Sequence, residues 1–530
     1  MASKRSSFLI VPVFIAACAL VGGIYGQRLV TAHAADDQSE IDKSVKSFTR
    51  LYTAVEDNFA DPVTADKGIY KGAIPGMLRT LDPHSNFFDP KDLTLMREEQ
   101  RGHYYGVGMY VQGRNGKTVV TFPFTGSPAY KAGLRPGDVI TAVNGKSVDT
   151  LPTTEVAEML KGPRGTPVKL LVLREGSSKP LEFNMLRDEI SRSSVQDAMW
   201  VRPGIGYMHL ELFNETTSKE VQEHLQQFGE ANIKGLIIDL RDNPGGLLNE
   251  AVSVADKFLN KGDVIVSHHG RAQPEKVYRA SSGNHGYLFP IVVLVNRGSA
   301  SASEIVSGAL QDHDRGYVIG ENTFGKGLVQ TVFPLSESTA LSLTTAKYYT
   351  PSGRLIQRDY EHTSFFDYYY KTNTEARNDK DVKTTDAGRT VYGGGGISPD
   401  EKFTPEKLDK FEVEMMRKYA VPNFITHYFA EHSTELSKNW IADEATITQF
   451  HDYLMKHDVS FTEAEFTKDH DYIKRTLTGE IYKTAFSVDD SRKYYIQTDP
   501  LVQRAVDDMP KALALVNSSR KLVVQQRMNK

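Results

Sequence analysis

The sequence predicts a multidomain α+β protein in which a β-rich segment and an α/β core lie between helical regions. Three observations lead to this prediction. The chain has 530 residues, too many for one ordinary core. Its 40% apolar and 25% charged residues are typical of a globular protein. The apolar spacing changes from a helical period in residues 38–102 to short strands in 103–188, alternating strands and helices in 189–400, and a helical period again in 401–530.

The first 37 residues have the pattern of a signal peptide or a membrane anchor. Two basic residues precede an apolar run over residues 8–25, and Ala-His-Ala at residues 32–34 offers a cleavage site. The run is near the lower limit for a membrane span, so a retained anchor is an alternative to cleavage. Lipidation at Cys18 is a third alternative. All three predict a periplasmic or extracytoplasmic body, in the second case attached to the cytoplasmic membrane.

Composition excludes several function classes. The formal net charge of −4 provides no basic excess for nucleic acid. Cys18 is the only cysteine, so the folded part has no disulfide, thiol nucleophile or cysteine metal site. The sequence has no H-E-x-x-H motif for a zinc peptidase. We therefore predict no metal and no cofactor.

Residues 38–102 show helical spacing that Pro62 and Pro75 interrupt, and Leu81-Asp82-Pro83-His84-Ser85 has the composition of a turn. His84 could be catalytic. We favour a turn histidine hydrogen-bonded to the backbone beside Asp82.

Residues 103–188 consist of short strands with glycine turns, a Pro-Gly turn and an Asn-Gly corner at residues 144–145. The string S-P-A-x-x-A-G-L-x-P-G-D-x-I-x-x-V-N-G, which begins at Ser127, resembles a PDZ domain. Such domains add a peptide as a strand to a sheet edge and hold its terminal carboxylate with loop amides. The resemblance implies that Gly106, Val107 and Gly108 form that loop; the alternative is a simple turn.

The next segment places a Gly-Gly corner after a buried strand. Residues 234–240 form an apolar strand that leads to Gly245 and Gly246 and then to a helix. Backbone amides at such a corner can hold an anion. This signal is weak by itself, because many turns between a strand and a helix contain glycine.

A second corner carries the candidate nucleophile. The apolar strand 291–295 precedes Gly298-Ser299-Ala300-Ser301-Ala302-Ser303-Glu304 and a helical pattern. Ser301 and Glu304 fit a capping box, which is a structural explanation compatible with catalysis. A serine at a helix start lies where exposed amides favour an oxyanion, so the N–H of Ala302 and one amide of Gly245 or Gly246 could hold it.

Lys326 is the candidate base. No histidine falls in either corner, and the sequence has no G-x-S-x-G elbow. Lys326 lies between two glycines and among apolar residues, where desolvation lowers the pKa of an amine. In an extended segment Lys326, Leu328 and Gln330 project to the same side, so Gln330 could orient the amine.

The remaining segments are less informative. An aromatic insertion around residues 365–370 could hold unfolded substrate or fold on its own tyrosines. Residues 401–530 are helical and charged and show no catalytic motif, which favours a role in packing or assembly.

Together, G-S-A-S-A-S-E, T-F-G-K-G-x-V-Q, D-L-R-x-N-P-G-G-L and Y-Y-T-P-S-G-R closely resemble the carboxyl-terminal processing peptidases, or tail-specific proteases. The resemblance runs from about residue 40 to 400. It implies a Ser-Lys endopeptidase with a crotonase-like core, in which Ser301 is the nucleophile, Lys326 the general base and Gln330 its orienting partner. It also implies supporting roles for Ser299 and Ser303 and a structural role for Asp312.

We therefore expect an exported serine endopeptidase that binds proteins or peptides with accessible C-termini. An adaptor or self-association is compatible with the sequence. One alternative is a PDZ scaffold or chaperone with an inactive peptidase fold, and a weaker one is a hydrolase of small esters or amides.

Overall fold

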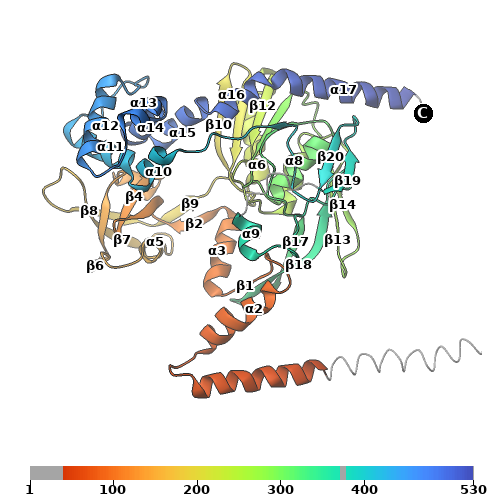
Figure 1. The fold of residues 1–530 in the computed structure, drawn as a ribbon, viewed down its shortest axis with the longest axis horizontal. Helices are drawn as coiled ribbons and strands as arrows, with labels where there is room; N and C mark the ends of the chain where they lie inside the picture. Colours follow the sequence, from red (N-terminus) through yellow and green to blue (C-terminus); the bar gives the residue numbers. More distant parts are fainter. Residues whose placement is uncertain (1–39, 371–377, 529–530) are drawn as a thin grey trace, which may run out of the picture. The chain divides into compact units, whose positions relative to one another are not determined.

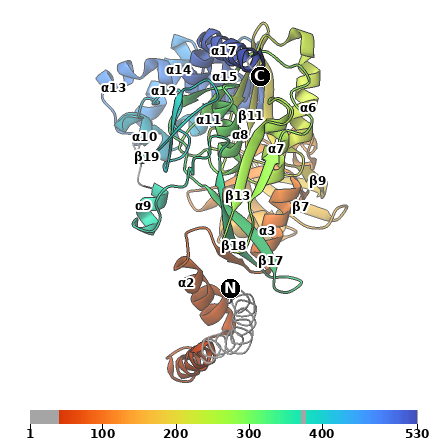
Figure 2. The same cartoon turned by 90° about the vertical axis from the view of Figure 1, so that its right-hand side faces the viewer.

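The structure is a computed structural model that describes residues 40–370 and 378–528 (Figures 1 and 2). The chain divides into two compact units, Met1–Asp89 and Pro90–Lys530. The predicted signal peptide or anchor and Cys18 lie outside the described residues. Within the described part, no helix is both long and apolar enough to cross a membrane.

The described part of the first unit, residues 40–89, is mostly helical, as its apolar spacing predicts. It contains a helix over residues 40–58, followed by η1 (Asp66–Ala73), α2 (Ile74–Arg79) and the short strand β1 (Asn86–Phe88). The predicted turn is present: Asp82 Oδ1 accepts hydrogen bonds from the backbone N–H of His84 at 2.7 Å and of Ser85 at 2.8 Å. His84 thus lies in a turn that Asp82 organises.

A six-stranded antiparallel sheet with its own core follows. Its order is β3-β4-β5-β7-β8, with β6 paired to β5. The elements of this domain are β2 (His103–Gly106), β3 (Met109–Arg114), β4 (Lys117–Pro123), α4 (Pro128–Lys131), β5 (Val139–Val143), β6 (Lys146–Ser147), α5 (Thr153–Leu160), β7 (Pro167–Leu173), β8 (Leu181–Leu186) and β9 (Asp188–Ser191). Asn144, with φ 51°, and Gly145, with φ 78°, form the predicted corner. Strand β3 lies at one edge of this sheet.

The central sheet has the order β10-β11-β12-β15-β16-β21. Its strands are β10 (Val195–Arg202), β11 (Ile205–Leu210), β12 (Gly235–Asp239), β15 (Ile291–Val295), β16 (Tyr317–Gly320) and β21 (Glu401–Lys402). All pairs are parallel except β10 with β11. The crossover helices are α6 (Thr217–Phe228), α7 (Leu248–Asp256) and α8 (Ala302–Asp312), with a short η2 (Glu230–Asn232).

Successive residues of the central strands pack into different cores, as the period of two requires. Leu236, Ile238 and Val293 belong to one core, which includes α6, α7 and α8. Ile237 and Leu294 face the opposite core. That second core is completed by α16 (Pro500–Asp507) and α17 (Met509–Met528), which come from the far end of the described chain (Figure 1).

A second antiparallel sheet lies in the same unit. It contains β13 (Val264–His269), β14 (Lys276–Arg279), β17 (Leu328–Pro334) and β18 (Ala340–Tyr349), in which β18 pairs with both β17 and β13. The aromatic insertion forms α9 (Phe365–Tyr370), and β19 (Asn378–Thr384) pairs with β20 (Thr390–Gly393). Tyr368 is buried, whereas Phe366 and Tyr370 are each 68% exposed, so the insertion folds only partly on its own aromatic side chains.

The predicted C-terminal region contains two groups of helices. The first packs around a core of its own, with Phe411, Phe424 and Phe450 at its centre. It includes α10 (Lys410–Arg417), α11 (Ala420–Glu431), α12 (Glu444–Lys456), α13 (Glu463–Lys468) and α14 (His470–Ala485). The second group, α15 (Val488–Gln497), α16 and α17, contributes to the core on the central sheet. The α+β fold class predicted from the sequence is confirmed, including the helical C-terminal region.

The first helix group also contacts the β3-β4 sheet (Figure 1). The hydroxyl of Tyr419 accepts a hydrogen bond from Gln112 Nε2 at 2.9 Å, and the guanidinium of Arg114 lies 4.9 Å from the centre of the Tyr419 ring. The C-terminal region therefore touches both the β-rich domain and the central sheet.

Candidate active site

Ser301 lies in a strained corner between a buried strand and a buried helix. β15 and α8 are buried along their whole lengths. Ser301 is the N-cap of α8 and has φ 53° and ψ −110°, a conformation that L-residues rarely adopt. Such strain costs about 1–3 kcal/mol and persists only where the surrounding structure holds it.

The two flanking serines fasten this corner to Leu240 and to the glycine loop, residues 241–247, that follows it. Ser299 Oγ donates to Leu240 O at 2.7 Å, and Ser303 Oγ donates to Asn243 O at 3.0 Å. Both side chains are fully buried, whereas Ser301 lines a cavity. Ser301 therefore differs from its two neighbours in facing the cavity; its role as nucleophile stays a prediction.

The glycine loop passes against the serine corner so closely that side chains would not fit. A Cβ atom at Gly245 would lie 2.8 Å from Ser301 Cβ and 2.9 Å from Ala302 N. A Cβ atom at Gly246 would lie 2.1 Å from Phe213 O. The φ angles of the two glycines are 103° and 139°, so both positions require glycine on conformational grounds as well.

The two glycines differ as candidate oxyanion donors. The N–H of Gly245 already donates to Asn243 Oδ1 at 2.9 Å. Within the described part of the chain, no acceptor takes a hydrogen bond from the N–H of Gly246 or of Ala302. Ala302 N–H also lies in the first turn of α8, where the helix dipole favours negative charge. We therefore expect Gly246 rather than Gly245 to act with Ala302.

The buried carboxylate of Glu304 joins the serine corner to the lysine loop, residues 323–327. Its Oε2 accepts from the backbone N–H of Ser301 at 2.8 Å and of Lys326 at 2.9 Å. Its Oε1 accepts from Thr323 Oγ1 at 2.5 Å and from Gly325 N–H at 2.7 Å. Burial raises the pKa of Glu304, and these four hydrogen bonds oppose the shift. One side chain thus fixes the backbone of Ser301 relative to that of Lys326.

Tyr348 on β18 provides a second link between the same two loops. Its hydroxyl forms hydrogen bonds with Ser301 O, at 3.1 Å, and with Lys326 O. The side chain is fully buried, and this burial raises the pKa of the phenol well above its usual value. Tyr348 therefore remains a neutral hydrogen-bond donor.

Ser301 and Lys326 line the same cavity, which has a volume of about 410 Å³. Gly245, Gly246 and Gln330 line it too, while Ala302 is fully buried and is not one of the lining residues. The rest of the wall is largely apolar and includes Leu212, Phe213, Leu247, Leu248, Ile305, Leu328 and Val329. The structure thus brings the predicted residues of both corners to one site.

Gln330 reaches this cavity from β17 through an irregular strand. A register shift between Val329 and Gln330 breaks the simple alternation, so Leu328, Val329 and Gln330 all line the cavity. Gln330 Nε2 donates to Thr344 Oγ1 at 2.9 Å, which leaves the amide oxygen as the atom able to accept from an amine. An orienting role for Gln330 stays a prediction.

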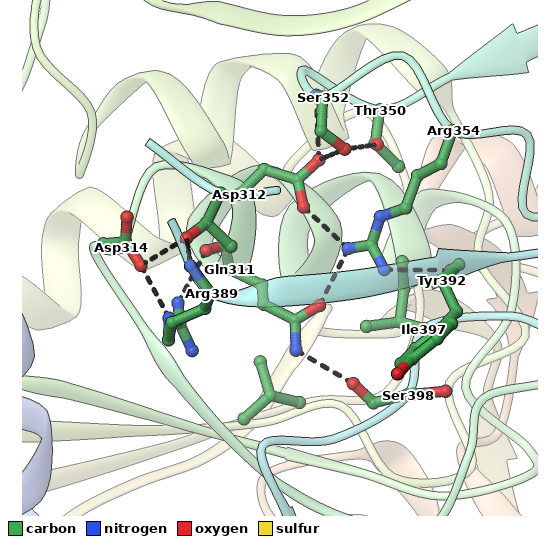
Figure 3. A network of polar contacts seen from close by, with 12 residues as sticks. Gln311, Asp312, Asp314, Thr350, Ser352, Arg354, Arg389, Tyr392, Ile397 and Ser398 are labelled. Carbon is green, nitrogen blue, oxygen red and sulfur yellow. Dashed lines mark hydrogen bonds and ion pairs between the residues drawn. The ribbon is translucent and has the colours of Figure 1, made fainter. Parts of the chain in front are cut away.

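A buried ion pair anchors the far end of α8 (Figure 3). Arg354 is fully buried, and its Nη2 lies 2.7 Å from Asp312 Oδ1. Asp312 Oδ2 accepts from both the N–H and the hydroxyl of Ser352, at 3.0 and 2.7 Å. This geometry fits the structural role predicted for Asp312, because the helix that carries Ser301 at one end is tied down at the other.

The predicted carboxylate-binding loop connects β2 with β3. Val107 is buried in the core of the β-rich domain, and a Cβ atom at Gly108 would lie 2.5 Å from Ser127 Cβ. Ser127 Oγ donates to Gly108 O at 2.7 Å. Among the described residues, none accepts a hydrogen bond from the backbone N–H of Val107 or Gly108. Gly106 pairs with Asp188 in the β2-β9 ladder, so it is part of a strand.

Sequence reasoning missed part of this site. Glu304 appeared only as a capping partner, and Tyr348 only as a letter of a motif. The sequence signal for Glu304 was its place in a helix whose other residues are mostly small or apolar. A carboxylate in a fully buried helix is rare, so this position could have been recognised as unusual. Within the described residues, no group of three or more His, Cys, Asp or Glu side chains is arranged to hold a metal ion.

The chain is similar in sequence to known proteins. A sequence model of peptidase family S41 matches residues 204–361, and one of PDZ domains matches residues 119–174. The carboxy-terminal-processing protease of Bartonella bacilliformis is 40% identical over 359 residues, 67% of this chain and 80% of that protein. The carboxy-terminal processing protease CtpA of Bacillus subtilis is 33% identical over 354 residues, 66% of this chain and 74% of that protein. A solved structure of a photosystem II D1 C-terminal processing protease is 30% identical, covering 68% of this chain and 88% of that one, with a TM-score of 0.35.

Proposed function

The chain belongs to peptidase family S41, among the serine-type carboxy-terminal processing proteases, and from this premise we propose a Ser-Lys mechanism with Ser301 as nucleophile and Lys326 as general base. The observation that carries the proposal is the double link through Glu304 and Tyr348. These side chains hold the two loops together at one cavity.

In the proposed acylation step, the neutral amine of Lys326 takes the proton of Ser301 Oγ while this oxygen attacks the carbonyl carbon of the scissile peptide bond. The carbonyl oxygen becomes an oxyanion, which the N–H groups of Ala302 and Gly246 stabilise. The lysine ammonium then gives its proton to the leaving nitrogen, the C–N bond breaks, and an acyl-Ser301 ester remains. Water, deprotonated by Lys326, attacks the ester; the ammonium returns this proton to Ser301 Oγ as the ester C–O bond breaks, and the carboxylate product leaves.

We further propose that the PDZ domain selects substrates by their C-terminal region. Strand β3 is an edge strand of its sheet, as strand addition of a peptide requires. The N–H groups of Val107 and Gly108 at its start have no acceptor among the described residues, so they are free to bind a terminal carboxylate. Export remains a proposal that rests on the apolar run over residues 8–25.

The test is digestion of an unfolded protein that carries a free C-terminus. We expect Ser301→Ala and Lys326→Ala to abolish hydrolysis while the circular dichroism spectrum stays unchanged. Ser338→Ala, at an exposed serine, is the matched control and should retain full activity. Hydrolysis by the folded Ser301→Ala protein would refute the mechanism.

A second arm tests recognition. The same substrate with an amidated C-terminus should be cleaved more slowly, because the amide cannot replace the carboxylate at the PDZ loop. Equal cleavage of both substrates would contradict PDZ selection while leaving the mechanism intact. Activity should also rise with pH over the range in which the Lys326 amine loses its proton, and a flat profile would count against a lysine base.

A further inference from the structure

The C-terminal region reaches the active site through an ion pair at the start of the glycine loop. Arg241 begins this loop and contacts two carboxylates. Its Nη2 lies 2.6 Å from Asp239 Oδ2, and its Nη1 lies 2.9 Å from Asp499 Oδ2. Asp239 lies at the end of β12, while Asp499 comes 258 residues after Arg241.

Asp239 and Asp499 hold the guanidinium in different ways. Asp239 is buried and also accepts a hydrogen bond from Tyr207 at 2.8 Å, so it holds Arg241 to the end of β12. Burial lowers the pKa of Arg241, but attraction first to Asp239 and then to Asp499 outweighs this effect and raises it. Arg241 is therefore positively charged and is held in place by both carboxylates.

Asp499 is itself held rigidly. Its Oδ1 caps α16 by accepting from the N–H groups of Leu501 at 2.8 Å and Val502 at 3.1 Å. The side chains of Leu501 and Val502 are buried in the core on the central sheet. One carboxylate oxygen therefore fixes α16, and the other fixes Arg241.

The position of Arg241 bears on the oxyanion site because only a short stretch of chain separates them. Arg241 is followed by Asp242, whose φ is 57°, and by Asn243, whose side chain accepts from Gly245 N–H. Gly246 comes next. Only four residues separate Arg241 from Gly246, so we expect a shift at Arg241 to alter the position of the N–H that is the proposed oxyanion donor.

We infer that Asp499 is a positioning residue for the reaction: it fixes Arg241, and through it the glycine loop, in the conformation that presents Gly246 N–H to the oxyanion. The inference rests on the proposed function. It makes the C-terminal region a contributor to the catalytic step.

The test is Asp499→Asn in the full-length protein. Asparagine caps helices as well as aspartate does, so α16 keeps its cap. The substitution nonetheless removes the charge and can turn an N–H₂ group toward Arg241. Asp443→Asn is the matched control, because Asp443 caps α12 through Thr446 N–H at 2.9 Å and the structure shows no arginine bound to it among the described residues.

We expect Asp499→Asn to lower kcat about tenfold, equivalent to about 1.4 kcal/mol of transition-state stabilisation, with KM changed less than twofold. The inhibition constant of a peptide aldehyde, which adds to Ser301 and places its oxygen where the oxyanion forms, should rise by the same factor. The control should match the wild type in all three quantities.

Unchanged kcat and aldehyde inhibition in a folded Asp499→Asn protein would overturn the inference, as would an equal loss in Asp443→Asn. An increase in KM alone would also overturn it, because it would assign Asp499 to substrate binding. Failure of the proposed function has a different signature, since Ser301→Ala would then remain active.

Discussion

Replacement of Glu304 by glutamine tests how the two catalytic loops are held together. The carboxylate accepts four hydrogen bonds, two at each oxygen. A glutamine has one oxygen and one N–H₂ group, so it must lose acceptors on one side. It should keep its oxygen toward Ser301 and Lys326, because on the other side the hydroxyl of Thr323 can rotate and accept from the new amide.

The magnitude follows from counting the donors that lose a partner. In Glu304→Gln only Gly325 N–H is left unsatisfied, which costs about 1–3 kcal/mol. In Glu304→Ala the N–H groups of Ser301, Gly325 and Lys326 all lose their acceptor, and the same scale gives about 3–9 kcal/mol. The second loss is comparable with the whole stability of a typical domain, about 5–15 kcal/mol.

Urea unfolding gives the free energies, and active-site titration with initial rates gives kcat per folded molecule. We expect the glutamine variant to fold and to keep at least a tenth of the wild-type kcat. The alanine variant should lose most of its free energy of unfolding and most of its kcat. Wild-type stability and kcat in Glu304→Ala would show that this carboxylate does not hold the loops.

Three further outcomes can be checked. Burial lowers the pKa of His313, but hydrogen bonds to Asp386 and a backbone carbonyl raise it to about 9. The protonated His313 therefore contributes at most about 3 kcal/mol to the free energy of unfolding, and this contribution is complete below pH 6.5 and lost as pH rises through 9. His313→Asn should flatten the dependence on pH of the free energy measured by urea unfolding. Gly245→Ala should abolish peptide hydrolysis, because its Cβ would lie 2.8 Å from Ser301 Cβ; wild-type rates would contradict the packing. Tyr348→Phe should cost about 1–3 kcal/mol in urea unfolding, because buried carbonyl oxygens lose their donor, and unchanged stability would contradict the link.

Much of the site could be predicted from local sequence, because Ser301 and Lys326 each lie in a distinctive motif. The strand over residues 291–295 was also predictable, since a short apolar run bounded by turn residues leaves few alternatives. The choice between Gly245 and Gly246 was not, because it depends on where the side chain of Asn243 points.

Long-range contacts could not be predicted from the sequence, for a different reason. Apolar spacing shows that a helix face is buried but not what buries it. Nothing in residues 401–530 indicates that Phe424 packs within a separate helical core whereas Val502 packs on the central sheet. The approach of Asp499 to Arg241 depends on that packing and could not be anticipated.

The arrangement of the central sheet also has a consequence for biosynthesis. One apolar face, which includes Ile237, Val292 and Leu294, is covered by α15, α16 and α17, the first of which begins at Val488. During translation this face stays uncovered until the ribosome has passed those codons, long after Ser301 and Lys326 have been made. These helices are therefore the last part of the described chain to be made, and we expect this face of the sheet to become buried only late in synthesis.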